Sequence, residues 1–419
     1  MEKNKGILVG IDLADDYTQI CCTGTHGDLS SVSLSEDPLK YRIPTMLCAL
    51  AGSADWLFGE EAASVIPTDQ HFKISNILEL AREDRGIEIF ERLYSPDILL
   101  ERFLRRLIAG LKEKNGIDQI RGIVVTMNHC EPLLTKNLMS AFELLGFDEN
   151  SVKIINHIES FMYYVVSQNY DIWINDVGLF DFDEEGFSFY KLSFGRKQKP
   201  VNVLAEKTDL SGSVSFEMLM SGDTNRLINA FEDSITLMLH KQLVSALYFT
   251  GCGFESAWAD ESLKKLCNGR RIFRGQNLYV RGAGCAAKLL YEGGSDEYRF
   301  IPDDVLKSSV CIRVYTDGGY EELPIANIGD PYRDAAADIR VIMDKTNELD
   351  LIVHNVLKKD FICAIMTLET LNLRPDRTTR LDVRIRFPER DVCVITVRDV
   401  GFGEIYKTDH KIWEQVLKI

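Results

Sequence analysis

The order of apolar segments in the first 250 residues is the feature that most constrains the fold of this chain. A predicted strand hairpin is followed by alternating helices and strands, and this order occurs twice. In the first copy, strands are predicted at residues 7–11, 17–22, 120–126 and 152–155, and helices at 96–115, 134–145 and 157–168. In the second copy, strands are predicted at 178–182, 186–192 and 246–250, with a helix at about 224–243. The pattern predicts an α/β core made of two similar halves.

The sequence changes character after Pro302. Short alternating strands separated by turn residues are predicted at 310–315, 351–356, 362–368, 381–387 and 392–397. This pattern of short strands and turns is typical of an all-β domain. We therefore expect an α/β domain at residues 1–302, a β-sandwich at 303–408 and a short C-terminal helix at 409–419.

The charge balance argues against a polyanionic partner. Acidic residues outnumber basic ones by 64 to 48, which gives a formal net charge of −16, and no local basic stripe is present. Such a chain repels nucleic acid. The N-terminal apolar run is interrupted by Asp12, and no segment reaches the ~18 apolar residues of a membrane helix. We expect no signal peptide and no membrane span.

Cysteine and histidine residues are scattered along the chain. Only Cys21 and Cys22 are adjacent among the ten cysteines, and none forms a Cys-x-x-Cys pair. None of the seven histidines stands at metal-ligand spacing with another histidine or cysteine. Because zinc sites and disulfides require clustered ligands, this distribution predicts a reduced, cytoplasmic protein with structural thiols.

Short motifs occur in a fixed order along nearly the whole chain. They lie at residues 10–13, 124–128, 155–160, 180–187, 251–253, 281–284 and 393–403. In this order they resemble the actin–hexokinase–heat-shock ATPase superfamily, and more closely the 70-kDa heat-shock chaperones. Each motif is weak alone, and the resemblance depends on their common order.

The resemblance implies a duplicated actin-like (ribonuclease-H-like) domain followed by a substrate-binding β-sandwich. It places Asp12 and Asp181 where the family organises magnesium and phosphates, and Gly251 and Gly253 in the loop that contacts adenosine. The glutamate that the family has in its Asn-Glu-Pro turn is His157 here. No general base is therefore carried over to this chain.

The two hairpin tips depart from the family pattern. Family hairpins use glycines and hydroxyls so that backbone N–H groups can surround the triphosphate. The tips here are acidic and read Ala14-Asp15-Asp16 and Asp183-Glu184-Glu185. Each pair of like charges about 5 Å apart costs about 3 kcal/mol at an effective dielectric constant near 20. We therefore expect no cofactor, and the alternative is that the chain binds ATP and magnesium. A second interpretation of the acidic tips is that they are solvated hairpin turns with no ligand nearby.

Further departures from the family concern the subdomain that encloses adenine, the interdomain linker and the helical lid. Only about 60 residues, 191–250, stand where the family has a whole subdomain that encloses adenine. The segment that resembles the interdomain linker contains Pro302, Asp303 and Asp304, which disfavour strand addition. The chain given also has no equivalent of the long helical lid.

These departures favour a non-catalytic, chaperone-like or adaptor protein, a pseudo-ATPase that binds a protein or peptide. One alternative is a divergent chaperone ATPase that still uses Asp12 and Asp181 to hold magnesium–ATP. Another is an actin-like polymerising protein, although the appended β-sandwich counts against free filament contacts. The partner and the oligomeric state stay open at this point.

Overall fold

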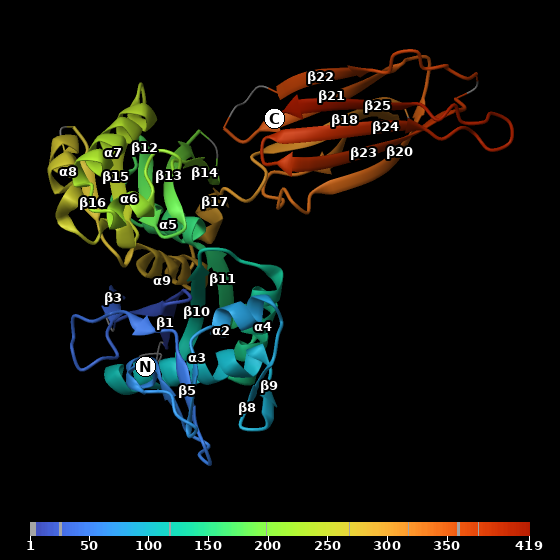
Figure 1. The fold of residues 1–419 in the computed structure, drawn as a ribbon. Coiled ribbons are helices and arrows are strands. Elements are labelled where there is room, and N and C mark those ends of the chain that lie inside the picture. Colours follow the sequence, from blue (N-terminus) through green and yellow to red (C-terminus); the bar gives the residue numbers. More distant parts are fainter. Residues whose placement is uncertain are drawn as a thin grey trace, which may run out of the picture. The chain divides into compact units, whose positions relative to one another are not determined.

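The computed structural model describes residues 6–24, 27–116, 119–197, 199–267, 269–316, 318–357, 361–375 and 377–419. The fold is mixed α/β, as the sequence predicts. Contacts divide the chain into two compact units. The first comprises Met1–Lys191 and Thr208–Asp296, and the second Leu192–Lys207 and Glu297–Ile419 (Figure 1).

A six-stranded sheet forms the first half of the α/β region. Its strands are β1 (Ile7–Leu13), β2 (Tyr17–Thr23), β3 (Leu29–Val32), β4 (Ile43–Pro44), β10 (Ile120–Met127) and β11 (Val152–Asn156). Their order is β11-β10-β1-β2-β3, with β4 paired to β2. The predicted β1–β2 hairpin is confirmed as antiparallel, and β10 runs parallel to β1 and to β11. All seven residues of β1 are buried, which explains its continuous apolar run.

A second six-stranded sheet repeats this arrangement. Its strands are β12 (Asp176–Asp183), β13 (Gly186–Gly195), β14 (Val201–Asp209), β15 (Val244–Thr250), β16 (Arg271–Arg274) and β17 (Tyr298–Ile301). The order is β16-β15-β12-β13-β14-β17, with β15 parallel to β12 and to β16. The order β11-β10-β1-β2-β3 in the first sheet therefore has its counterpart in β16-β15-β12-β13-β14.

Helices connect the strands in both halves. They are α1 (Gly59–Ser64), α2 (Ile77–Arg82), α3 (Pro96–Asn115), α4 (Pro132–Leu144), α5 (His157–Val166), α6 (Phe216–Met220), α7 (Thr224–Leu239), α8 (Asp260–Leu266) and α9 (Leu278–Glu292). The predicted ends of α3 are confirmed, with Pro96 in its first turn and Gly116 in the left-handed conformation at φ 61°. The Ser95 hydroxyl, however, donates to the Asp97 carboxylate and makes no capping bond to the backbone.

Residues 47–94 form small elements that the sequence did not predict. These are a sheet of β5 (Leu47–Leu50), β6 (Trp56–Phe58) and β7 (His71–Ile74), and a hairpin of β8 (Ile87–Ile89) and β9 (Arg92–Tyr94). They pack with the first sheet, because Leu47, Ile74 and Tyr94 belong to its apolar core.

Close packing of α9 fixes the position of the candidate site. Helix α9 contacts α5 and also β1 and β10 (Figure 1). A Cβ on Gly282 would lie 2.2 Å from the Ser160 carbonyl oxygen, and one on Gly10 would lie 2.4 Å from the Gly284 nitrogen. Glycine at 10 and 282 therefore lets the backbones of α9, α5 and β1 approach closely. The N-terminal ends of α5 and α9 supply two site residues.

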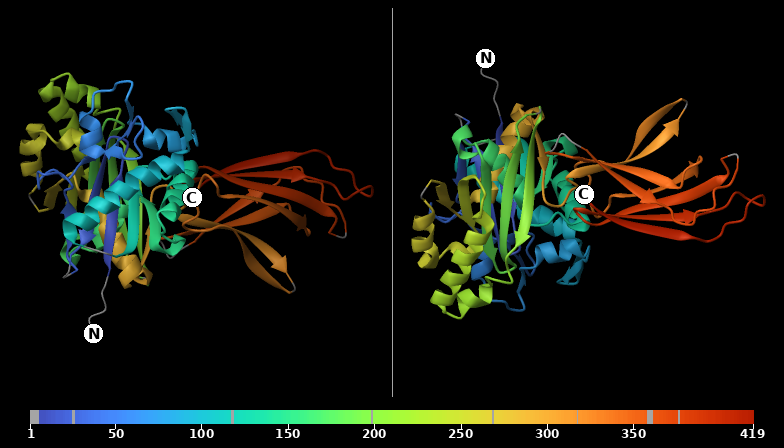
Figure 2. Two further views of the ribbon diagram at one scale, coloured as in Figure 1. Left: turned by 90° about the horizontal axis from the view of Figure 1, so that it is seen from below. Right: turned by 90° about the horizontal axis from the view of Figure 1, so that it is seen from above.

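The second unit contains two four-stranded sheets over one apolar core. One has the order β19-β18-β21-β22 and the other β20-β23-β24-β25. The strands are β18 (Ser308–Thr316), β19 (Gly319–Ala326), β20 (Ala336–Met343), β21 (Glu348–Asn355), β22 (Phe361–Thr367), β23 (Thr379–Glu389), β24 (Val392–Asp399) and β25 (Ile412–Lys418). Inner residues such as Ile312, Leu351 and Ile395 belong to the shared core. Figure 2 shows these long strands in orange and red.

The prediction of a short C-terminal helix at 409–419 is wrong. Residues Ile412–Lys418 form β25, which pairs antiparallel with β24. The spacing of the apolar residues in this segment fits both a helix and a strand. Hydrogen bonds to the edge of β24 favour the strand. Trp413 and Leu417 alternate with exposed neighbours and pack on the core as strand residues.

Strands β14 and β17 are bound tightly into the second unit. The partly buried Arg390 guanidinium donates to the carbonyl oxygens of Ala205 at 2.5 Å, Pro302 at 2.8 Å and Val305 at 2.7 Å. Ile301, next to Pro302, is fully buried. The segment around Pro302 is therefore held by hydrogen bonds and apolar packing together.

All ten cysteines are free thiols. Among the described residues, no helix combines the length and the apolar character that crossing a membrane requires.

Candidate functional site

Asp12 and Asp181 occupy equivalent positions in the two sheets. Asp12 near the end of β1 pairs with Thr126 of β10, and Asp181 near the end of β12 pairs with Thr250 of β15. Each carboxylate thus lies near the C-terminal end of a central strand, next to a parallel strand. Both residues belong to the first unit.

His157 contacts Asp12 directly. Asn156 caps α5 by accepting a hydrogen bond from the Glu159 N–H at 2.7 Å, which places His157 in the first position of the helix. The His157 Nε2 atom lies 2.8 Å from Asp12 Oδ1, and because a carboxylate accepts, the imidazole donates. Only 14% of the His157 side chain and 6% of the Asp12 side chain are exposed.

Tyr279 continues the contact from His157 to Asp181. The two rings stack with their centroids 4.0 Å apart and their planes 7° from parallel. The Tyr279 hydroxyl donates to Asp181 Oδ2 in a short hydrogen bond. Tyr279 lies two residues before the 281–284 motif and was not among the predicted site residues. We call the resulting chain of contacts, Asp12–His157–Tyr279–Asp181, the carboxylate–ring bridge.

The bridge perturbs both of its ring residues. Burial lowers the pKa of His157, but the Asp12 carboxylate, together with the charges of Asp181 and Asp183, outweighs this effect, so the pKa lies above its ordinary value. Burial and the negative charge of Asp181 hold the pKa of Tyr279 well above its ordinary value. Near neutral pH the phenol therefore keeps its proton and remains a hydrogen-bond donor to Asp181.

The first acidic tip makes contacts within the protein. Arg82 of α2 binds Asp15 through both carboxylate oxygens, at 2.8 and 2.7 Å. The Asp16 side chain is exposed, while its carbonyl oxygen accepts from the Thr45 N–H at 3.1 Å. The Ala14 carbonyl accepts from the Thr45 hydroxyl at 2.7 Å. The tip is thus held by α2 and by Thr45.

The second acidic tip is a self-capped turn. Asp183 accepts from the backbone N–H groups of Glu185 at 2.9 Å and Gly186 at 3.2 Å. Burial, followed by the nearby Glu185 charge, raises the pKa of Asp183. Glu185 accepts from the Asn128 amide at 2.6 Å, and Glu184 is exposed. Asp15, Asp183 and Glu185 therefore have protein partners.

Gly251 and Gly253 are required for packing against β12. Gly251 has a φ of 93°, and a Cβ there would lie 2.2 Å from the Phe182 carbonyl oxygen. A Cβ on Gly253 would lie 2.3 Å from the Phe182 ring. The structure thus places this loop beside Asp181 and gives both glycines a packing role.

These residues do not fit a magnesium–phosphate group as the protein stands. One oxygen of Asp12 forms a hydrogen bond with His157 and one oxygen of Asp181 with Tyr279, and the two stacked rings connect the carboxylates.

Two buried side-chain oxygens beside Asp12 lack hydrogen-bond partners within the described ranges. Gln19 Oε1 and Thr126 Oγ1 have no hydrogen-bond partner among the described residues, and both residues pair with Asp12 on adjacent strands.

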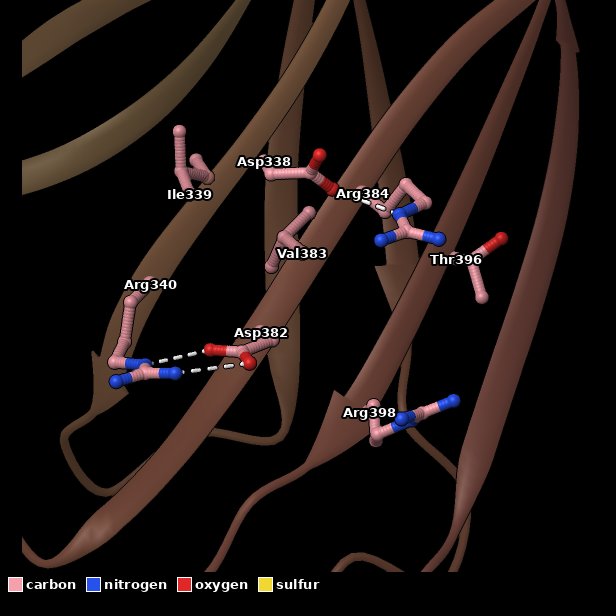
Figure 3. Close-up of a pocket in the computed structure, with 8 residues that line it drawn as sticks. All are labelled: Asp338, Ile339, Arg340, Asp382, Val383, Arg384, Thr396 and Arg398. Carbon is pink, nitrogen blue, oxygen red and sulfur yellow. Dashed lines mark hydrogen bonds and ion pairs between the residues drawn. The ribbon is translucent and has the colours of Figure 1, made fainter.

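A charged groove lies on the second unit. It has a volume of about 530 Å³ and is lined by Asp338, Ile339, Arg340, Asp382, Val383, Arg384, Thr396 and Arg398 (Figure 3). Arg340 binds Asp382 through two hydrogen bonds, at 2.6 and 3.0 Å, and Arg384 binds Asp338 at 2.8 Å. No ion pair to Arg398 is present in the part of the chain that the structure describes. Arg398 is exposed.

Comparison with known proteins places the chain in a family. Residues 305–419 match a domain of unknown function (DUF8552). No curated protein matches the chain. Residues 28–303 match the family described as "Family of unknown function (DUF5716) C-terminal", which is more than half of the 419 residues. The chain therefore belongs to this family.

Proposed function

We propose that this protein is a non-catalytic, chaperone-like or adaptor protein of the cytoplasm that acts by binding a protein or peptide. In this proposal, the first half is a reduced, actin-like duplicated domain that has lost ATPase activity, and the second half is a β-sandwich. The shared strand order of the two six-stranded sheets supports a duplication. The paired sheets over one core support a sandwich.

The carboxylate–ring bridge is the observation that carries the proposal. An ATPase of this type needs its two carboxylates open to hydrated magnesium and phosphate. Here a buried imidazole and a buried phenol bind them. Binding a nucleotide in this place requires the stacked rings to separate and a buried ion pair to break, and removing a buried ion partner costs about 3–5 kcal/mol.

The region that would enclose adenine also supports the loss of ATPase activity. The described residues between β13 and β15 form β14, α6 and α7. Nucleotide sites normally bury most of their ligand between apolar walls. The apolar face of α7, with Leu227, Phe231 and Ile235, instead packs into the core with Phe180 and Phe249.

The charged groove is the surface that we assign to the partner. Arg340 pairs with Asp382 and Arg384 with Asp338 across the strands. Arg398 lies opposite the already paired Asp382 and is exposed, and we assign it to a carboxylate on the partner. Side chains of both signs on one face suit a polar segment carrying an acidic residue.

A divergent ATPase is the second candidate, and one observation favours it. The buried Gln19 and Thr126 oxygens beside Asp12 lack partners among the described residues. Buried polar atoms of this kind are normally satisfied, so an ordered water or a hydrated ion bound there would satisfy both. Such a ligand would use Asp12 without opening the whole bridge.

Aggregation of a denatured reporter protein tests the proposal. The purified chain should suppress light scattering by the reporter equally with and without magnesium–ATP. Arg398→Glu should weaken the suppression, whereas Arg333→Glu, an exposed charge reversal outside the groove, should not. Nucleotide-dependent release would favour the ATPase, and concentration-dependent scattering by the chain alone would favour a polymerising protein.

A further inference from the structure

A cysteine, a glutamate and a histidine converge on one sheet of the second unit. Cys311 lies on β18, between β19 and β21, which carry Glu322 and His354. Cys311 is opposite Pro324 and Ile352, while Glu322 is opposite Arg313 and His354 is opposite Ser309. Glu322 and His354 are therefore diagonal neighbours of Cys311, one on each side of β18.

All three side chains lie on the sheet face that points away from the core. Val310 and Ile312, which flank Cys311 on β18, belong to the core, so Cys311 points to the opposite face. Paired and diagonal residues share a face, which brings Glu322 and His354 to the same side. Cys311 is buried, His354 is partly buried and Glu322 is exposed.

The ligand atoms of the three residues already lie close together. Cys311 Sγ, a Glu322 carboxylate oxygen and a His354 ring nitrogen are all within 4.8 Å of one another. His354 Nε2 is 2.8 Å from Glu322 Oε2. Zinc binds sulfur at about 2.3 Å and nitrogen or oxygen at about 2.0–2.2 Å, so tetrahedral ligands lie about 3.5 Å apart. Side-chain movements of about 1 Å would reach this geometry.

We propose that Cys311, Glu322 and His354 bind a zinc ion. Thiolate, imidazole and carboxylate are the ligand types that zinc prefers, and three protein ligands leave the fourth position to water or to a partner's side chain. On binding, the Cys311 thiol releases its proton to solvent. The proton that His354 Nε2 donates to Glu322 leaves to solvent while Nδ1 takes one up, so that the neutral imidazole binds zinc through Nε2 and the ion replaces the hydrogen bond between His354 and Glu322. The site would connect β19, an edge strand, to β18 and β21.

The surroundings define what zinc must overcome. Burial and the nearby Glu322 charge raise the pKa of the Cys311 thiol, so the metal-free protein keeps this thiol protonated near neutral pH. Arg313, opposite Glu322, is the nearest cation in this register and binds Asp350 at 3.3 Å. That ion pair directs the arginine charge toward Asp350.

Cobalt substitution tests the site in the full-length chain. After removal of metals with a chelator, Co²⁺ should give a thiolate charge-transfer band and the intense visible bands of tetrahedral cobalt, and Zn²⁺ should displace it. Loss of a residue that only supports a metal ligand costs about 10–100-fold in affinity, so Cys311→Ser and His354→Gln should each weaken binding at least tenfold. Glu322→Gln should also weaken it.

Cys363→Ser is the matched control. Cys363 lies on β22 opposite Ile352, two strands from Cys311, and is exposed. It is also a diagonal neighbour of His354, but it lies two strand spacings, about 10 Å, from Cys311 and does not belong to the group of converging ligand atoms. This variant should bind cobalt like the wild type, and circular dichroism should show that every variant keeps its sheet signal.

Three results would overturn the proposal: no saturable binding below about 0.1 mM metal, cobalt spectra without a thiolate band, or equal affinity in the wild type and in His354→Gln. The last comparison does not depend on the buried cysteine, because His354 is a partly exposed residue.

Discussion

Breaking the ion pair between Asp12 and His157 should destabilise the first unit strongly. The pair is buried and its atoms are 2.8 Å apart. His157→Ala leaves the Asp12 carboxylate buried without its cation, and such a change costs about 3–5 kcal/mol of the free energy of unfolding. Asp12→Asn removes the charge but preserves the shape of the side chain.

The same pair should make stability depend on pH. The pKa of His157 is raised in the folded protein, so its stabilisation is complete below the unfolded pKa of about 6.5 and is lost as pH rises through the folded value. In this window the free energy of unfolding of the wild type should fall by up to about 1.4 kcal/mol per pH unit. In Asp12→Asn the main cause of the raised pKa is gone, and burial, which lowers the pKa of His157, is opposed only by the charges of Asp181 and Asp183. The free energy of unfolding should therefore depend less steeply on pH.

Urea unfolding followed by tryptophan fluorescence measures both effects. Three of the four tryptophans, Trp56, Trp173 and Trp258, lie in the first unit, so a Trp413→Phe background reports on that unit. Titrations between about pH 6 and pH 9 cover the histidine window. A cost under about 1 kcal/mol for His157→Ala would contradict a stabilising ion pair. The same dependence of unfolding free energy on pH in Asp12→Asn and in the wild type would contradict it as well.

Three further predictions concern the second unit. Asp399→Ala should cost about 3–5 kcal/mol of the free energy of unfolding, because Asp399 is buried against Arg374 in a two-bond ion pair. Since that contact lowers the pKa of Asp399, the free energy of unfolding of the wild type should fall as the pH decreases in the acid range. Urea titrations that give the same free energy throughout that range would contradict this. The fragment 303–419 should fold alone without β14 and β17, because the described core between its two sheets begins at Leu306, and circular dichroism without a cooperative melt would refute it. Hydrogen exchange of residues 298–308 should be the same with and without magnesium–ATP, because Arg390 holds this segment; nucleotide-induced deprotection would indicate allosteric coupling.

Local patterns were sufficient for most of the α/β elements. The apolar runs of β1 and β10 and the proline and glycine at the ends of α3 depend on neighbours in sequence, and the structure confirms them. The strands between residues 47 and 94 are only three or four residues long and depend on packing against the first sheet. Their sequences carry too few residues to establish a period.

Contacts between distant segments could not be derived from the sequence. Asp12 and Asp181 were identified only through the resemblance to the ATPase family. The contacts of Tyr279 with Asp181 and His157 depend on the packing of α9 on α5. The replacement of a glutamate by His157 was the one available signal, because a histidine beside a buried carboxylate suggests an ion pair.

The candidate zinc site shows the same limit of spacing arguments. Cys311, Glu322 and His354 are separated by 11 and 32 residues along the chain. Only the strand registers bring them together. A search for ligands at short spacing therefore predicts no metal site here, and β25 was missed for a related reason, since its partner strand supplies the decisive hydrogen bonds.

Calorimetric titration of the full-length protein with magnesium–ATP measures whether a nucleotide binds between Asp12 and Asp181. In our proposal the carboxylate–ring bridge takes the place of a nucleotide ligand. With about 0.1 mM protein, we expect no saturable heat of binding. A dissociation constant in the low micromolar range, about −8 kcal/mol, would contradict it, because that affinity requires Asp12 and Asp181 to be open to the ligand.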